Sequence, residues 1–146
     1  MPMLHVTLTD DSHAVRHSRR KLLRLARAVL RRRMPKAGVE IALVGPRKMA
    51  ALNRRFLRRR GVTDVISFNL GPDEAGRVWG QVVVCADVAR REAAKRRIRP
   101  EDELALYVAH GALHLLGETD YDPKSRERMR RLAATALVRA GYRDVT

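Results

Sequence analysis

The segment Leu104–Leu116 constrains the fold more than any other part of this chain, because it is apolar on nearly every side. A helix without a polar face must be covered all round, so this segment is predicted to be the central buried helix. His110 and His114 are its only strongly polar interior side chains. Residues four apart on a helix share one face, with Cβ atoms roughly 5–6 Å apart. Packed or solvated imidazoles are the ordinary interpretation, but one metal ion would satisfy both buried rings.

The residues after this helix offer a third metal ligand. Gly117 can end the helix in a left-handed cap, and acidic residues follow it at Glu118, Asp120 and Asp122. Asp122 precedes Pro123 and is expected to cap the next helix, while Glu118 is expected to point away as the chain reverses. Asp120 is therefore the preferred ligand, with Glu118 and Asp122 as alternatives. Two histidines, one carboxylate and a position left for water make up a catalytic zinc site.

The residue after the first histidine argues against a peptidase. Zinc peptidases with an HExxH helix carry a glutamate there as general base, and this chain has Gly111. A metal-bound hydroxide can itself attack or take a proton, with arginines neutralising a phosphodiester. The pattern thus favours phosphodiester hydrolysis over peptide hydrolysis.

The charge of the chain points to a polyanionic partner. Thirty-one Lys and Arg against sixteen Asp and Glu leave a net charge of +15. A high-GC genome would explain arginine in place of lysine, but not the surplus over acids. Arginine donates two parallel hydrogen bonds to phosphate, so nucleic acid is the favoured partner. The basic helices lack the exposed aromatic face of membrane anchors, which makes a membrane surface the weaker choice.

The lengths of the apolar stretches and the single cysteine indicate where the protein is found in the cell. No stretch approaches the roughly 20 apolar residues that cross a bilayer, so we expect no membrane association. Cys85, the single cysteine, lies in an apolar run and is expected to be a buried thiol. One cysteine excludes an intramolecular disulfide and fits a cytoplasmic protein.

The remaining patterns predict an α+β fold with a small mixed four-stranded sheet and about five helices, in one domain spanning 1–146. Strands are expected at 3–9, 39–44, 63–70 and 78–86, the last two as a hairpin. Helices are expected at 12–34, 46–56, 88–97, 100–116 and 123–140, capped by Asp11 or Ser12, Asp87 and Asp122. The outer side of the first helix carries an arginine stripe at Arg16, Arg20, Arg24, Arg27 and Arg31. A solvated basic face is its ordinary interpretation, and an RNA-facing surface is the alternative.

Three motifs in order resemble the YbeY family of bacterial rRNA-maturation endoribonucleases. His110–Gly117 is similar to the first eight residues of the family signature HGxLHLxGxDH. Leu52-Asn53 followed by Thr63–Phe68 resembles the family's LN pair and TDVLSF-like strand. Gly80-Gln81-Val82 resembles its GDI-type strand.

This resemblance implies an α+β domain with one Zn²⁺ per chain. The family's third histidine falls on Asp120 here, the position preferred above. The implied activity is cleavage of single-stranded RNA, with 3′-end maturation of small-subunit (16S) rRNA and ribosome quality control. The implied partners are rRNA and the small ribosomal subunit, and we expect a cytoplasmic monomer.

The hypothesis assigns roles to individual residues. His110, His114 and Asp120 hold zinc, and the metal-bound water is the nucleophile or general base. Arg58 and Arg59, together with Arg55, are expected to clamp phosphates, and Ser67 to hydrogen-bond the substrate.

Besides Asp120, three further positions differ from the family pattern. Leu57 stands where an arginine is expected, Val62 where a proline is expected, and Gln81 where an acid is expected. The differences at Leu57 and Gln81 support an alternative function: an RNA- or ribosome-binding factor whose metal is structural.

Overall fold

A computed structural model describes residues 3–58, 61 and 63–146. In chain order the elements are β1 (His5–Asp10), α1 (Arg19–Leu30), β2 (Gly38–Val44), α2 (Pro46–Leu52), a π-helical turn (Asn53–Leu57), β3 (Val65–Pro72), β4 (Val78–Cys85), α3 (Ala86–Arg96), α4 (Pro100–Leu115) and α5 (Pro123–Arg139). The α+β class, the four-stranded mixed sheet and the five α-helices are as predicted from the sequence.

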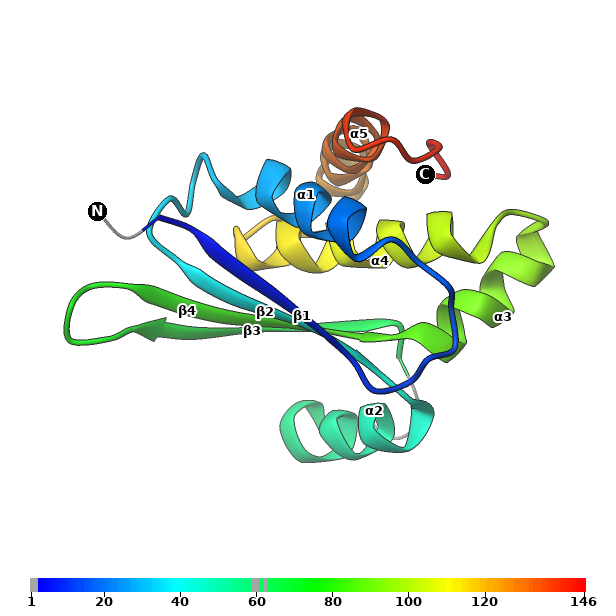
Figure 1. Cartoon of the computed structure of the whole chain (residues 1–146), viewed down its shortest axis with the longest axis horizontal. Helices are drawn as coiled ribbons and strands as arrows, with labels where there is room; N and C mark the ends of the chain where they lie inside the picture. Colours follow the sequence, from blue (N-terminus) through cyan, green and yellow to red (C-terminus); the bar gives the residue numbers. More distant parts are fainter. Residues whose placement is uncertain (1–2, 59–60, 62) are drawn as a thin grey trace.

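The sheet has the strand order β1-β2-β4-β3. The first three strands are parallel, and β3 runs antiparallel to β4, so the expected hairpin is present. A register shift between Asn69 and Gly71 puts a bulge near the end of β3. Figure 1 shows α1 and α4 side by side on one face, α5 above them and α2 beneath the other face. Because side chains alternate along a strand, residues such as Leu8, Ile41 and Val82 face the helices and are buried.

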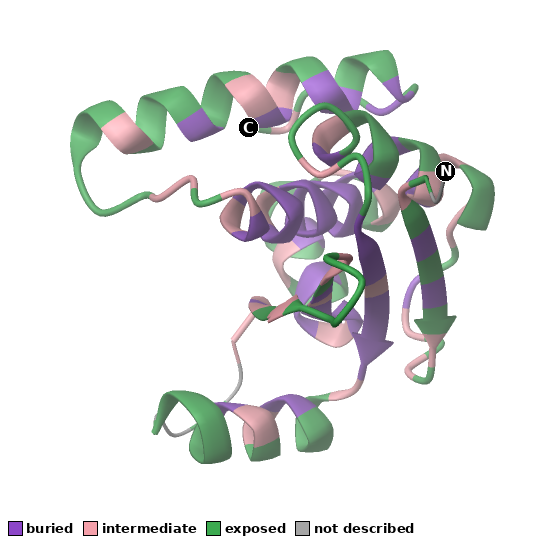
Figure 2. Cartoon of the chain, turned by 90° about the vertical axis from the view of Figure 1, so that its left-hand side faces the viewer, coloured by how far each residue is buried: buried purple, intermediate pink, exposed green. Residues whose placement is uncertain are grey.

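The helix α4 is the centre of the molecule. Twelve of its sixteen residues are buried, and Figure 2 shows it enclosed between the sheet and α5. The prediction of a central buried helix is therefore confirmed. Pro100 starts α4, and the buried acids of its first turn are paired: Asp102 with Arg99 at 3.0 Å, and Glu103 with Arg96 at 2.6 Å. Those pairs compensate the cost of burying two carboxylates.

The first helix begins later than the sequence suggested. It starts at Arg19 with Ser18 as N-cap, seven residues after the expected start at Ser12. The Asp10 carboxylate accepts from the backbone N–H groups of Ser12 and His13 and lies 3.0 Å from His17 Nε2. These bonds hold the chain in a turn, with His13 at φ 54°, so the helix cannot nucleate there.

The cap expected at Asp87 is also wrong. The helix α3 begins at Ala86 with Cys85 as N-cap, which places Asp87 in the first turn. An acid there still complements the positive helix end. Two other expectations are confirmed: Asp122 caps α5 by accepting from Ser125 N at 2.8 Å, and Cys85 is buried. Among the described residues, no helix has the length and apolarity that spanning a bilayer requires.

Candidate functional site

Two glycines let α4 lie directly on β3 and β4. A Cβ added at Gly111 would lie 2.3 Å from Val82 Cγ1 and 2.9 Å from Val65 Cγ2. A Cβ at Gly80 would lie 3.2 Å from Leu115 Cδ1. The Ser67 hydroxyl donates to the Gly111 carbonyl at 2.7 Å and fastens the same contact. Ser67 was expected to hydrogen-bond the substrate. Its hydroxyl proton is already donated to the Gly111 carbonyl, so a hydrogen bond donated to the substrate would have to replace this structural one.

His110 precedes Gly111 on α4, and its side chain is half-buried. Burial lowers the pKa of His110, and the neighbouring His114 lowers it further. Two carboxylates act in the opposite direction, Asp64 more strongly than Asp120. The net shift is downward, so the ring is neutral at neutral pH. Neutral imidazole is the form that binds a metal ion.

His114 is oriented by the turn that follows it. Its Nδ1 lies 3.1 Å from the carbonyl oxygen of Glu118. A carbonyl can only accept, so Nδ1 carries the proton, and in the neutral ring the lone pair is on Nε2. A histidine whose second nitrogen donates to a carbonyl has the arrangement common to metal-ligating histidines.

The turn itself is a Schellman motif. Gly117, at φ 90°, donates from its backbone N–H to the His114 carbonyl, and Glu118 donates to that of Leu113. The Glu118 carboxylate is held by Arg128 at 2.8 Å and by Arg33 at 3.0 Å. Hydrogen bonds from Arg128 and Arg33 lower the pKa of Glu118 despite partial desolvation. These pairs turn the carboxylate toward α5 and the end of α1.

Asp120 is exposed, and in the described part of the chain its carboxylate takes part in no ion pair. Its charge still acts on His110. The protonation state of His110 and the tautomer of His114 thus both suit a metal ion. Within residues 3–58, 61 and 63–146, no three side chains of His, Cys, Asp or Glu converge closely enough to hold one. His110 and His114 are therefore the defined part of the candidate centre, and the structure does not bring Asp120 together with them as a third ligand.

Asp64 is a neighbour of His110 that sequence reasoning missed. It sits just before β3, where its carboxylate accepts from Val65 N at 2.8 Å. It is the strongest charge acting on His110. A carboxylate at the start of a strand was the available signal, but its charge acts on a histidine more than forty residues away in the sequence.

The basic residues expected to clamp phosphates lie on the segment between α2 and β3. Arg58 is exposed and left-handed at φ 52°, and Arg55 lies 5.2 Å from the Phe56 ring. Arg59 and Val62 fall outside the described residues. Asn53, buried in the π-helical turn, donates to the Gly61 carbonyl at 3.0 Å and so ties this segment to α2. Among the described side chains no hydrogen bond or ion pair joins Arg55 or Arg58 to the histidines.

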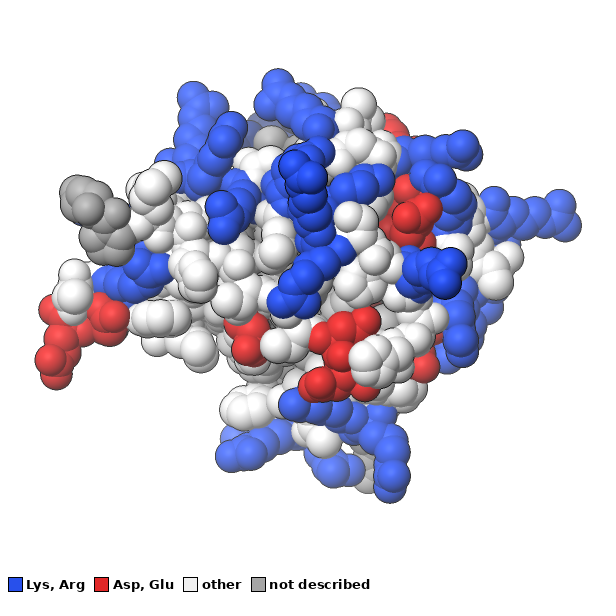
Figure 3. All heavy atoms as spheres, viewed as in Figure 1, with Lys and Arg blue, Asp and Glu red and all other residues white. Residues whose placement is uncertain are grey.

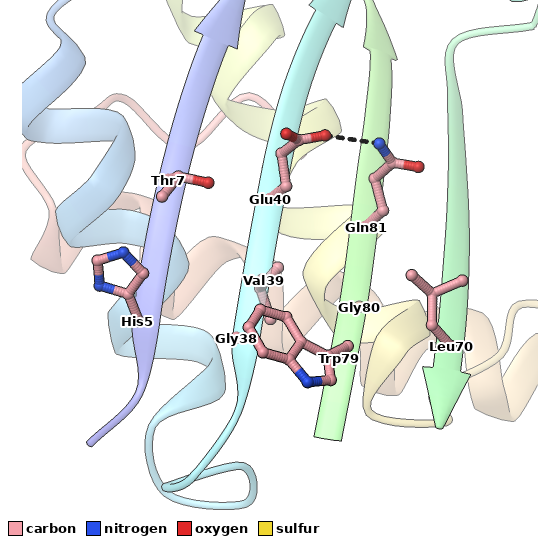
Figure 4. Close-up of a pocket in the computed structure, with 9 residues that line it drawn as sticks. All are labelled: His5, Thr7, Gly38, Val39, Glu40, Leu70, Trp79, Gly80 and Gln81. Atoms are coloured by element: carbon pink, nitrogen blue, oxygen red, sulfur yellow. Dashed lines mark hydrogen bonds between the residues drawn. The ribbon is translucent and has the colours of Figure 1, made fainter. Parts of the chain in front are cut away.

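Gln81 lies on the face of the sheet away from α4. Its amide donates to the Glu40 carboxylate at 2.6 Å, and the pair lies in a hollow of about 320 Å³ beside Trp79 (Figure 4). The neighbouring Val82 points the other way, toward Gly111. The family difference at Gln81 is therefore separated from the histidine pair by the sheet.

Known proteins are similar to this chain in sequence and in fold. The sequence model of the family described as "Endoribonuclease YbeY" matches residues 6–141. Relatives named "Endoribonuclease YbeY" include one from Anaeromyxobacter sp. (strain Fw109-5), 40% identical over 74% of this chain, and one from Myxococcus xanthus, 36% identical over 94%. Another from Thermobifida fusca is 38% identical over 84% of this chain.

The lengths of these proteins differ. The chain spans 59% and 48% of the first two relatives and 84% of the third. The solution structure of TM1509 from Thermotoga maritima has the same fold, with a TM-score of 0.58 at 21% identity, covering 94% of this chain and 91% of that one. With the family model matched over nearly the whole sequence, the chain belongs to the YbeY endoribonuclease family.

Proposed function

We propose that this protein is a zinc-dependent endoribonuclease that cleaves single-stranded RNA in the 3′-end maturation of small-subunit rRNA. The observation that carries the proposal is the histidine pair. His110 is neutral through burial, and His114 has its Nε2 lone pair left free by the Glu118 carbonyl. Membership of a family named for endoribonuclease activity supplies the reaction class.

In this proposal His110, His114 and Asp120 hold one Zn²⁺. When bound, the ion lowers the pKa of a coordinated water and polarises a phosphoryl oxygen. The Glu118 carbonyl fixes the His114 ring, and the Asp64 charge favours a developing positive charge on His110. Asp120 has no competing ion pair in the described part of the chain, so its carboxylate is available as a ligand.

Phosphate binding is assigned to the basic segment before β3. Arg55 and Arg58 are exposed, and Arg59 continues the run in sequence. A guanidinium offers a bidentate fork to a phosphodiester, which orients the strand and neutralises its charge. We also propose that the small ribosomal subunit is the partner of this protein, and that the protein is cytoplasmic and monomeric.

The test compares the zinc-loaded wild type with His114→Ala on single-stranded rRNA fragments. We expect His114→Ala to lose at least about 100-fold in kcat/KM, because removing a ligand costs more than removing its supporting hydrogen bond. His5→Ala changes an exposed histidine on β1 and should cleave like the wild type. Equal cleavage by wild type and His114→Ala would contradict the metal mechanism. Zinc bound at one per chain without cleavage would favour the binding-factor alternative.

A further inference from the structure

A second basic surface lies on the helical layer. Five exposed arginines on α1, at its C-terminal end and on α5 line one hollow of about 570 Å³, and we call them the arginine face: Arg20, Arg24, Arg27, Arg31 and Arg139. Residues three and four apart share a helix side, so the first four form one stripe. Figure 3 shows basic side chains gathered over this upper layer. Its remaining lining residues, Leu23 and Ala28, are apolar.

The arginines of the arginine face lack acidic partners among the residues that the structure describes. In the part of the chain that the structure describes, none of its five arginines forms an ion pair. Other arginines do: Arg33 and Arg128 share Glu118, and Arg130 pairs with Glu127. Like charges three or four residues apart on a helix repel one another and lower its stability. A bound anion would relieve this repulsion among the arginines of the stripe.

A neighbouring hollow extends this surface toward the candidate metal centre. It measures about 480 Å³ and shares Ala28 and Arg139 with the first. Arg32 adds another cation to its lining, together with Leu113 of α4 and Leu116, the C-cap of that helix. Leu113 precedes His114, so the basic surface reaches the back of the helix turn that carries the histidine.

We propose that the arginine face binds the sugar–phosphate backbone of double-helical RNA, next to the single-stranded segment that the enzyme cleaves. This inference rests on the proposed function, which brings RNA to the protein. Single-stranded sites stack bases on aromatic side chains, and no aromatic residue lines this hollow. A duplex hides its bases and presents phosphates and 2′-hydroxyls, which arginine forks bind. The same lack of aromatic residues disfavours a membrane surface.

The experiment measures binding of a short blunt-ended RNA hairpin, which has no single-stranded tail, by fluorescence anisotropy between 50 and 200 mM salt. The variant is Arg27→Gln/Arg31→Gln/Arg139→Gln, and the matched control is Arg90→Gln/Arg91→Gln/Arg97→Gln at exposed positions of α3 and its C-cap. We expect the first variant to bind at least about tenfold more weakly, with a salt slope smaller by roughly two to three. The control should stay near the wild type, and Arg27→Lys/Arg31→Lys/Arg139→Lys should recover most of the affinity.

Each result decides the question. Equal losses in both glutamine variants would mean that net charge alone binds RNA, and would overturn the assignment. A polyglutamate peptide bound as tightly as the hairpin, and released by the same three substitutions, would overturn it in favour of an acidic protein. Circular dichroism melts check that the variants fold. Hairpin binding through the face without cleavage of any single-stranded RNA would remove the proposed nuclease function, but it would still assign double-helical RNA to the arginine face.

Discussion

At the residue scale, Gly111 is important to the candidate site because it has no side chain. In the sequence, Gly111 matters because it replaces the glutamate of zinc peptidases. In the structure it matters because α4 contacts Val82 and Val65 at this residue. Both explanations hold, but only the close packing against Val82 and Val65 predicts that any side chain at position 111 lowers the stability of the protein.

Gly111→Ala is expected to destabilise the protein by about 2 kcal/mol. Alanine gains about 1 kcal/mol of helix propensity over glycine, but the clash with Val82 at 2.3 Å costs more, since overpacking a core typically costs 1–3 kcal/mol and this contact is unusually short. Urea denaturation measures the difference. Adding Val82→Ala should recover part of the loss, although it also removes buried methyl groups. Gly45→Ala is the control, because a Cβ there meets nothing within 4 Å. A Gly111→Ala protein as stable as the wild type would contradict the packing role.

At the scale of elements, the start of α1 reflects a competition between capping groups. Asp11 and Ser12 have the side chains that favour an N-cap. The Asp10 carboxylate binds the nearby N–H groups of Ser12 and His13 first, and the helix starts only at Arg19. Local preference therefore identified the kind of element but not its first residue.

Ser18→Ala should cost about 1 kcal/mol of unfolding free energy, because Ser18 Oγ accepts from Lys21 N at 3.2 Å. Asp11→Ala should change it by less than about 0.5 kcal/mol, since Asp11 is exposed and caps no helix. Thermal or urea melts of the two variants give the comparison. The reverse order would place the helix start where the sequence pattern put it.

At the scale of the whole molecule, metal binding should stabilise the fold. A ligand that binds only the folded state at 100 times its Kd adds about 2.7 kcal/mol, which for a chain of this size raises Tm by roughly 5–10 °C. We expect Zn²⁺ to raise the Tm of the wild type and a chelator to reverse the increase. His110→Ala should show neither response, and His5→Ala should behave like the wild type. A zinc-induced increase that persists in His110→Ala would place the metal elsewhere.

The fold was largely predictable from the sequence, and the assembled site was not. The apolar run of α4, the hairpin and the Asp122 cap each follow from local patterns that tertiary contacts reinforce. The electrostatic influence of Asp64 on His110 joins distant segments, so no local pattern reveals it. The position of the Asp120 carboxylate depends on an exposed turn, whose conformation the residue types leave open.

The Schellman turn after α4 also has an evolutionary consequence. The group that holds His114 is the main-chain carbonyl of residue 118, which every amino acid possesses. Ring orientation is thus insulated from mutation at position 118, where exchanging the glutamate removes only its ion pairs with Arg33 and Arg128. The vulnerable position is Gly117, whose φ of 90° few other residues tolerate. Position 118 can accordingly change during evolution without disturbing the His114 ring, whereas position 117 is restricted to glycine and the few residues that tolerate its backbone conformation.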